Sequence, residues 1–265
     1  MLKLVPMAVV LVLSYSCQAR LSSSELEGAS KKQHCLDACP EVKKGNRLVV
    51  HDIYSLSNNP DTKFADWAAY KVTPESLGAG SEGVRAWQAD PTLPETETLE
   101  PPDYAGAFEE LEVDRGHQVP LASFLGTQFW KETNYLSNIT PQKSALNQGP
   151  WKRLETAERN LTKKFDAVWV LTGPVYEASE PTLPHADEEH RVPSAYWKVI
   201  TLMDGDRRIT GGFYFEQDTD READICQHVM SLKNIQKYSK LNASLGSGGK
   251  RLDENNEFLS LINCL

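Results

Sequence analysis

The feature that most constrains this chain is a short alternating segment that ends in an arginine and a histidine. Leu111 and Val113 lie two residues apart, which predicts a strand. Residues two apart share one face of a strand, so Arg115 and His117 are expected to point into the same groove. Gly116 between them lets the backbone bend or lets a ligand approach closely. A guanidinium beside an imidazole suits a general base that works next to an anion, although a strand end with solvated polar residues gives the same pattern.

A helical pattern follows further along the chain. An apolar stripe is formed by Trp151, Leu154, Leu161 and Phe165. A second set recurs every four residues and forms one slowly turning face, made of Asn147, Trp151, Glu155 and Arg159. An amide, a carboxylate and a guanidinium on one face, beside an Arg/His strand, can be assembled into a phosphodiester-cleaving site. The alternative is that Glu155 and Arg159 are only a supporting i,i+4 pair on the helix surface.

A proline fixes where this helix is expected to begin. Pro150 has no amide N–H and belongs near the first helical position. We therefore expect the regular helix to start near Gly149, with Asn147 in the turn that leads into it, and to run to about Lys164.

Several motifs occur in one order along the chain: Asp114-Arg115-Gly116-His117, then Ser137 to Gln142, then Leu146-Asn147-Gln148-Gly149, then Trp151 with Leu154-Glu155. In this order and spacing they resemble the DRGH family of DNA/RNA non-specific endonucleases, close to its secreted, sugar-non-specific (Serratia-type) branch. The resemblance extends from about Tyr54 to Phe215. It implies a ββα-metal, or His-Me finger, active site.

Two residues are expected to carry the chemistry. His117 is the predicted general base, because imidazole titrates near the working pH. Asn147 is the predicted metal ligand, because a neutral amide oxygen suits hard Mg²⁺, which keeps most of its waters when few protein ligands are offered. Mn²⁺ is the alternative ion.

The resemblance implies supporting roles for further residues. Glu155 is expected to orient the metal-bound water and Asn138 to support the site, while Arg115 and Arg159 face the phosphate and the developing charge. Asp114 carries over as a motif residue whose role the sequence does not fix.

The segment 73–107 is rich in Pro, Gly and acidic residues and is interpreted as a long surface connection. Connections of this length are often functional. Arg85 lies early in it, and the resemblance makes this residue a candidate arginine on the phosphate side of the site.

The remaining pattern predicts an α+β fold with a central, mostly antiparallel sheet flanked by helices. Strands are expected at 47–54, 64–72, 165–176, 196–202 and 210–215, and a helix at 226–241. His51 is interpreted as a structural histidine in the first strand, and His185 and His190 as solvated residues of an acidic loop.

The N-terminus predicts export. Lys3 precedes a short apolar run, and small residues around Ala19 suggest cleavage after it, so 1–19 is interpreted as a signal peptide. We expect a secreted protein with no membrane span. The alternatives are a periplasmic location or a lipid anchor on Cys17.

Removal of that segment leaves four cysteines, which allow three pairings. Nearness in sequence favours Cys35–Cys39 and Cys226–Cys264, and the resemblance implies the same pairs. Half of a metal site at Cys35 and Cys39 is the weaker alternative, since no second Cys/His pair stands at finger spacing. The expected organisation is a disulfide-tied arm at 20–45 and a single nuclease domain at 46–265.

The chain has 265 residues and a formal net charge of −9, which argues against binding nucleic acid through the whole surface. A local cationic track is still predicted at 143–164, where Lys and Arg outnumber Glu. We therefore predict a Mg²⁺-dependent endonuclease that cleaves DNA and RNA with little sequence preference. The resemblance implies 5′-phosphorylated products and a homodimer. The rivals are a nucleic-acid-binding or effector protein without turnover, and a phosphodiesterase for small substrates.

Overall fold

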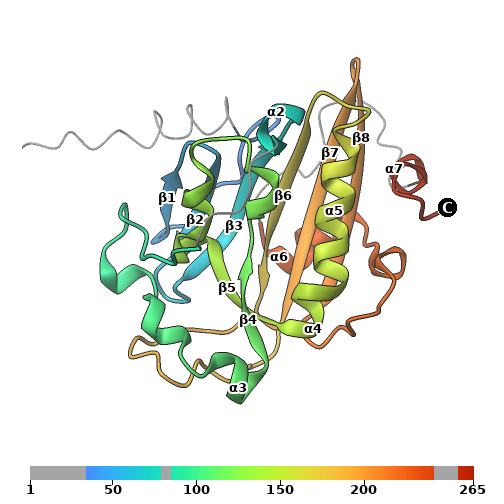
Figure 1. The fold of residues 1–265 in the computed structure, drawn as a ribbon. Coiled ribbons are helices and arrows are strands. Elements are labelled where there is room, and N and C mark those ends of the chain that lie inside the picture. The colour runs from blue at the N-terminus through green and yellow to red at the C-terminus, as the bar shows by residue number, and fades with distance from the viewer. Residues whose placement is uncertain (1–33, 79–84, 242–255) are drawn as a thin grey trace, which may run out of the picture.

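The computed structural model describes residues 34–78, 85–241 and 256–265. The predicted signal peptide, Cys17 and most of the predicted arm lie outside the described residues. The described chain is built on a six-stranded antiparallel sheet with the order β1-β2-β3-β6-β7-β8, which forms the centre of Figure 1. The predicted α+β class is confirmed.

The strands of this sheet are β1 (Arg47–Val50), β2 (Tyr54–Asn59), β3 (Phe64–Val72), β6 (Val168–Val175), β7 (Ala195–Asp204) and β8 (Arg207–Glu216). The single strand predicted at 47–54 is wrong, because the chain turns back after β1 and the His51 N–H donates to the Tyr54 carbonyl at 2.9 Å. Apolar residues continue on both sides of this tight turn, so the hydrophobic pattern does not show it.

The two faces of the sheet are visible along β7. Tyr196, Ile200 and Leu202 belong to the core on one face, where the helix α5 (Lys152–Leu161) packs. Trp197 and Val199 face the opposite side, where α6 (Leu232–Ser239) covers them. Each large side chain buried in this way stabilises the fold by about 1.5–3 kcal/mol. In Figure 1 α5 lies in front of β7 and β8, and α6 behind the sheet.

A separate two-stranded ribbon pairs β4 (Val113–His117) with β5 (Ile139–Lys143) in antiparallel register. Figure 1 shows that this ribbon leads directly into α4 and α5. One link to the large sheet is the carbonyl of Pro141, which accepts hydrogen bonds from the Tyr196 hydroxyl at 2.7 Å and from Gln217 Nε2, just after β8, at 2.9 Å. Strand, strand and helix therefore follow one another as the motif resemblance implies.

The helix after β5 begins earlier than predicted. It starts as α4 (Ser144–Leu146), widens into a π-helical turn (Asn147–Trp151) and becomes regular only in α5, which ends at Leu161 rather than Lys164. Pro150 cannot donate to the helix, and Gly149 has φ −98° and ψ −114°. A Cβ at Gly149 would overlap the Arg221 carbonyl, so only glycine allows this close approach.

The other helices are short. They are α2 (Pro74–Leu77), α3 (Ala107–Leu111) and α7 (Asn256–Leu261), with 3-10 turns at Glu95–Glu97, Pro101–Tyr104, Leu121–Ser123, Trp130–Asn134, Leu136–Asn138 and Ile225–His228. Leu111 therefore ends a helix instead of opening the catalytic strand. The helix predicted at 226–241 is divided between the last of these turns and α6, because Ser231 caps α6 by accepting from the Asn234 N–H.

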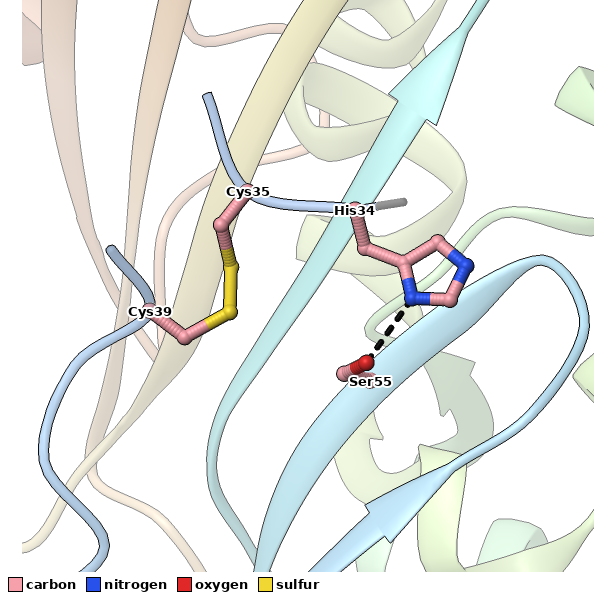
Figure 2. The surroundings of a disulfide bond; sticks show 4 residues. All are labelled: His34, Cys35, Cys39 and Ser55. Atoms are coloured by element: carbon pink, nitrogen blue, oxygen red, sulfur yellow. Dashed lines mark hydrogen bonds between the residues drawn. A yellow bond between two sulfur atoms is a disulfide. The ribbon is translucent and has the colours of Figure 1, made fainter. Parts of the chain in front are cut away.

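Both predicted disulfides are present, Cys35–Cys39 and Cys226–Cys264. Figure 2 shows the first one beside His34, whose Nδ1 lies 2.8 Å from the Ser55 hydroxyl of β2. Burial lowers the pKa of His34 to about 4, so the ring is neutral near pH 7. The disulfide-bonded segment is thus held against the sheet through a neutral histidine.

The remaining histidines separate into two kinds. His51 is structural, as predicted: it is buried and its Nε2 lies 2.8 Å from Asp90 Oδ2. His185 is exposed, as predicted. The prediction of a solvated His190 is wrong, because its buried ring accepts from the Leu183 N–H and donates to the Glu188 carbonyl. No helix among the described residues is long and apolar enough to cross a membrane.

Candidate functional site

The end of β4 places His117 in a polar and aromatic setting. Its Nε2 donates to Asn134 Oδ1 at 3.2 Å, and its ring lies 5.4 Å from that of Trp87. An amide oxygen can only accept, so this bond assigns the proton of the neutral ring to Nε2 and the lone pair to Nδ1. The histidine therefore presents one fixed tautomer.

Asp114 lies three residues earlier on the same strand and binds the start of the helical segment. Its Oδ1 accepts from the Ser144 hydroxyl at 2.7 Å, and its Oδ2 accepts from Asn147 Nδ2 at 2.9 Å and Gln148 Nε2 at 2.8 Å. A carboxylate accepts and does not donate, so it selects the NH₂ side of the Asn147 amide. Asp114 therefore orients this amide, with its oxygen directed away from the carboxylate.

Arg115 points to the side of β4 that also carries His117, as the alternation predicts. Its guanidinium donates to the Pro101 carbonyl at 3.1 Å and lies over the rings of Trp87, at 5.6 Å, and Tyr104, at 5.0 Å. Burial lowers the pKa of Arg115 from its usual value. The ring of Trp87 therefore contacts both the arginine and the histidine.

A cleft of about 640 Å³ opens between β4, α3 and the π-helical turn. Four of the predicted site residues line it together, namely Arg85, Asp114, Arg115 and Asn147. Trp87, Tyr104 and Phe108 add aromatic surface. Arg85, which the resemblance made a candidate, thus lines the same cleft as the motif residues.

Glu155 and Arg159 lie on α5, outside the lining of this cleft. The Arg159 guanidinium donates to the Thr156 hydroxyl at 2.9 Å. Glu155 is partly buried, and desolvation raises its pKa to about 7 against the opposing effect of the nearby Lys198 ammonium. A carboxyl with this pKa changes its charge near neutral pH.

Comparison with known proteins identifies the family. The family model for DNA/RNA non-specific endonucleases matches residues 37–247. The chain belongs to this family. It is 43% identical to a nuclease of Serratia marcescens over 226 residues, covering 84% of this chain and 83% of the relative.

More distant relatives of this nuclease are found in eukaryotes. Nuclease C1 of Cunninghamella echinulata is 30% identical over 209 residues, covering 73% of this chain and 81% of the relative. Human mitochondrial endonuclease G is 33% identical over 172 residues, covering 59% and 54%. A crystal structure of EndoG in complex with EndoGI shares the fold, with a TM-score of 0.73 and 21% identity over 88% of this chain and 97% of that one.

Asn138, another predicted site residue of this nuclease, is fully buried. Its Nδ2 donates to the carbonyls of Val119 and Thr133, and its Oδ1 accepts from the Val119 N–H. These bonds tie the segment that carries Asn134 to the residues that follow His117. Both hydrogens and the oxygen of the Asn138 amide are therefore used within the fold.

A group of three acidic residues flanks Pro101, whose carbonyl accepts from Arg115. Ligand oxygens of Glu100, Asp103 and Glu188 lie within 4.8 Å of one another, close enough to share a cation. Burial and the neighbouring carboxylates raise the pKa of Glu100 to about 7. The family is metal-dependent, so this nuclease has two candidate positions for an ion, the acidic cluster and the amide oxygen of Asn147. None of the predicted site residues belongs to the cluster.

Sequence reasoning missed three residues that contact the predicted site. Asn134 lies shortly before the motif from Ser137 to Gln142, in a 3-10 turn, where spacing does not reveal which side chain faces the histidine. Trp87 is brought to β4 from the long connection. Lys198 could have been found from the sequence, because a lysine between Tyr196 and Ile200 interrupts the apolar face of an otherwise apolar strand.

Proposed function

We propose that this nuclease hydrolyses phosphodiester bonds in DNA and RNA with little sequence preference, using Mg²⁺ and releasing 5′-phosphorylated oligonucleotides. The proposal rests on two hydrogen bonds of β4 side chains, one between His117 and Asn134 and one between Asp114 and Asn147. Asn134 sets the tautomer of His117, and Asp114 sets the orientation of Asn147. A general base and a hard oxygen ligand are the two groups that metal-assisted hydrolysis needs.

His117 acts as the general base. With Nε2–H directed at Asn134, the Nδ1 lone pair takes the proton of a water that attacks phosphorus. The charge that then forms on the ring is stabilised by the amide oxygen at Nε2. Proton transfer by a positioned side chain contributes about 10²–10⁴-fold to rate.

Asn147 would hold the metal ion through its amide oxygen. A Mg²⁺ ion held there would supply Lewis-acid chemistry, which offsets the negative charge of the phosphate and of the O3′ that leaves as its bond to phosphorus breaks. Asp114 keeps the amide oriented, and its carboxylate adds negative charge where a hydrated cation is to be bound. Glu155, when ionised, orients water in this region. The neutral oxygen donor fits Mg²⁺ or Mn²⁺ better than a softer metal.

The arginines hold the substrate. Arg115 and Arg85 line the cleft, and Arg115 is already fixed by the Pro101 carbonyl and two aromatic rings. A pre-oriented guanidinium binds phosphate with little further loss of entropy. Arg159 of α5 faces the charge that develops during cleavage.

Low sequence preference follows from contacts to the backbone of the nucleic acid, which carry no base information. The exposed residues Lys152, Arg153, Lys163 and Lys164 of the predicted cationic track extend the positive surface along α5 and the residues that follow it. Binding should therefore weaken as salt concentration rises.

The protein is proposed to be secreted after removal of residues 1–19, with an arm at 20–45 and one nuclease domain at 46–265. The short apolar N-terminal run supports export. Homodimerisation is proposed on the family resemblance alone, and sedimentation of the purified protein tests it.

The decisive experiment incubates purified protein with plasmid DNA and with RNA, in Mg²⁺ and in chelator, beside His117→Ala. Wild type should cleave both polymers only with the metal, and His117→Ala should lose about 10²–10⁴-fold in rate. Intact polymers with wild type in Mg²⁺ would favour a binding protein without turnover. Full activity in His117→Ala would refute the assignment of the base.

A further inference from the structure

A lysine lies in the hydrophobic core beneath the helix that carries Glu155. The Lys198 side chain has 0% exposure, in a position on β7 between Tyr196 and Ile200. Lysine is almost never fully buried unless it is paired, because removing an ammonium ion from water is costly. Its presence on the face that packs against α5 therefore calls for a role.

The partners of Lys198 come from three elements. Its Nζ lies 2.8 Å from Glu158 Oε1 of α5, 3.2 Å from the Tyr70 hydroxyl of β3, and 4.4 Å from the centre of the Trp151 ring. The Tyr70 hydroxyl also donates to Glu158 Oε2 at 2.9 Å. The ammonium is thus held by a carboxylate, a phenol and an aromatic face.

Glu155 belongs to the same side of the helix. Trp151, Glu155 and Glu158 follow one another at i, i+4 and i+7, the spacing of one helical face. The charged groups near enough to influence Glu155 are Lys198 from β7 and Glu158 and Arg159 from its own helix. Tyr70 from β3 also faces this carboxyl.

We propose that Lys198 is a positioning residue of the nuclease site, which acts from beneath α5 by holding Glu155 in its charged form. The inference rests on the proposed function, in which ionised Glu155 orients water. Burial raises the pKa of Glu155, the ammonium of Lys198 lowers it and the carboxylate of Glu158 raises it. The two buried charges therefore shift the pH at which Glu155 ionises in opposite directions.

The opposite signs of the two buried charges make the inference testable. Lys198→Met removes the positive charge and should move the acidic limb of the pH profile of kcat/KM to higher pH, by about one to three units. Glu158→Gln removes the negative charge, leaves the lysine in place and should move the same limb to lower pH. Lys233→Met, an exposed change on α6, should leave the limb where it is.

A merely structural role would lower activity in both core variants without moving the limb in opposite directions. That result, or two shifts of the same sign, would overturn the inference. If Lys198→Met does not fold, Glu158→Gln decides alone, because an unmoved limb then contradicts the proposal.

A second readout separates this inference from the proposed function. The carboxyl carbon of Glu155 is titrated by NMR in metal-free protein, with Glu155→Gln to assign the signal. Its midpoint should rise in Lys198→Met and fall in Glu158→Gln whether or not nucleic acid is cleaved. An absence of cleavage by wild type would refute the proposed function, and a midpoint that neither variant moves would refute the role of Lys198.

Discussion

Two carboxylates near the site differ in exposure and in the charge of their hydrogen-bonding partners. Asp114 is half-buried at the cleft, and its three hydrogen-bond donors, from Ser144, Asn147 and Gln148, are all neutral. Glu158 is fully buried and is paired with the ammonium of Lys198. The first arrangement leaves negative charge at the cleft, beside the proposed metal ligand Asn147. The second cancels charge inside the core. In the proposed function the first carboxylate serves metal binding, whereas the second pairs a buried lysine beneath the helix that carries part of the site.

The largest expected effect concerns stability. Glu158→Ala leaves Lys198 buried without its partner, and breaking a buried pair in this way costs about 3–5 kcal/mol. Urea denaturation should show this loss of unfolding free energy. Asp114→Ala should cost much less in the same measurement, because its donors can turn to water. Equal losses of unfolding free energy in the two variants would show that the two carboxylates do not differ in their contribution to stability.

Asn147→Ala is expected to have the largest effect on activity. The variant loses the proposed metal ligand, so the rate should fall by more than the roughly 10–100-fold typical of residues that only support a ligand. Its unfolding free energy should be close to that of wild type. Cleavage assays over a range of Mg²⁺ concentrations, together with urea denaturation, test both statements. Wild-type metal dependence in this variant would be incompatible with the assignment.

Asp114→Ala should have a smaller effect on activity. The Asn147 amide would lose the group that orients it, which lowers metal affinity or rate by about 10–100-fold. Part of the loss should be recovered at higher Mg²⁺ concentration, whereas the loss in His117→Ala should not be. The same titration in both variants provides the measurement and its control.

The raised pKa of Glu155 predicts opposite pH trends for stability and for activity. Its pKa is raised to about 7 in the folded protein, above its usual value of 4.5. The folded protein therefore binds more protons than the unfolded chain between these values, and this contribution to stability is lost as pH rises toward 7. Activity should rise over the same range, because ionised Glu155 is the proposed working form. Glu155→Gln should flatten the pH profiles of both unfolding free energy and activity. If stability and activity of the wild type rise or fall together over this pH range, the proposed role of Glu155 is wrong.

The six-stranded sheet was largely predictable, because β3, β6, β7 and β8 are long apolar runs. The order of ribbon, helix and site motifs was also predictable. The split of 47–54 into two strands was not, because a tight turn between apolar residues leaves the hydrophobic pattern unchanged. The π-helical turn at Asn147 was missed because it depends on the close approach of the Arg221 backbone to Gly149, a contact between distant parts of the chain.

Within the site, residue types were easier to predict than partners. His117, Arg115 and Asn147 could be named from their motifs, and Arg85 from the resemblance alone. The hydrogen bonds from His117 to Asn134 and from Asn147 to Asp114 depend on side-chain directions, which spacing does not specify. The buried pair of Lys198 and Glu158 joins residues from β7 and α5, so only the packing of helix on sheet reveals it.

The central claim is that the catalytic metal is held at Asn147. Crystals of the protein soaked in Mn²⁺ and measured at the manganese edge test it most directly, because the anomalous signal locates the ion. The account predicts a peak about 2.2 Å from Asn147 Oδ1 that is absent in Asn147→Ala. A peak found only among Glu100, Asp103 and Glu188, and unchanged in that variant, would contradict it.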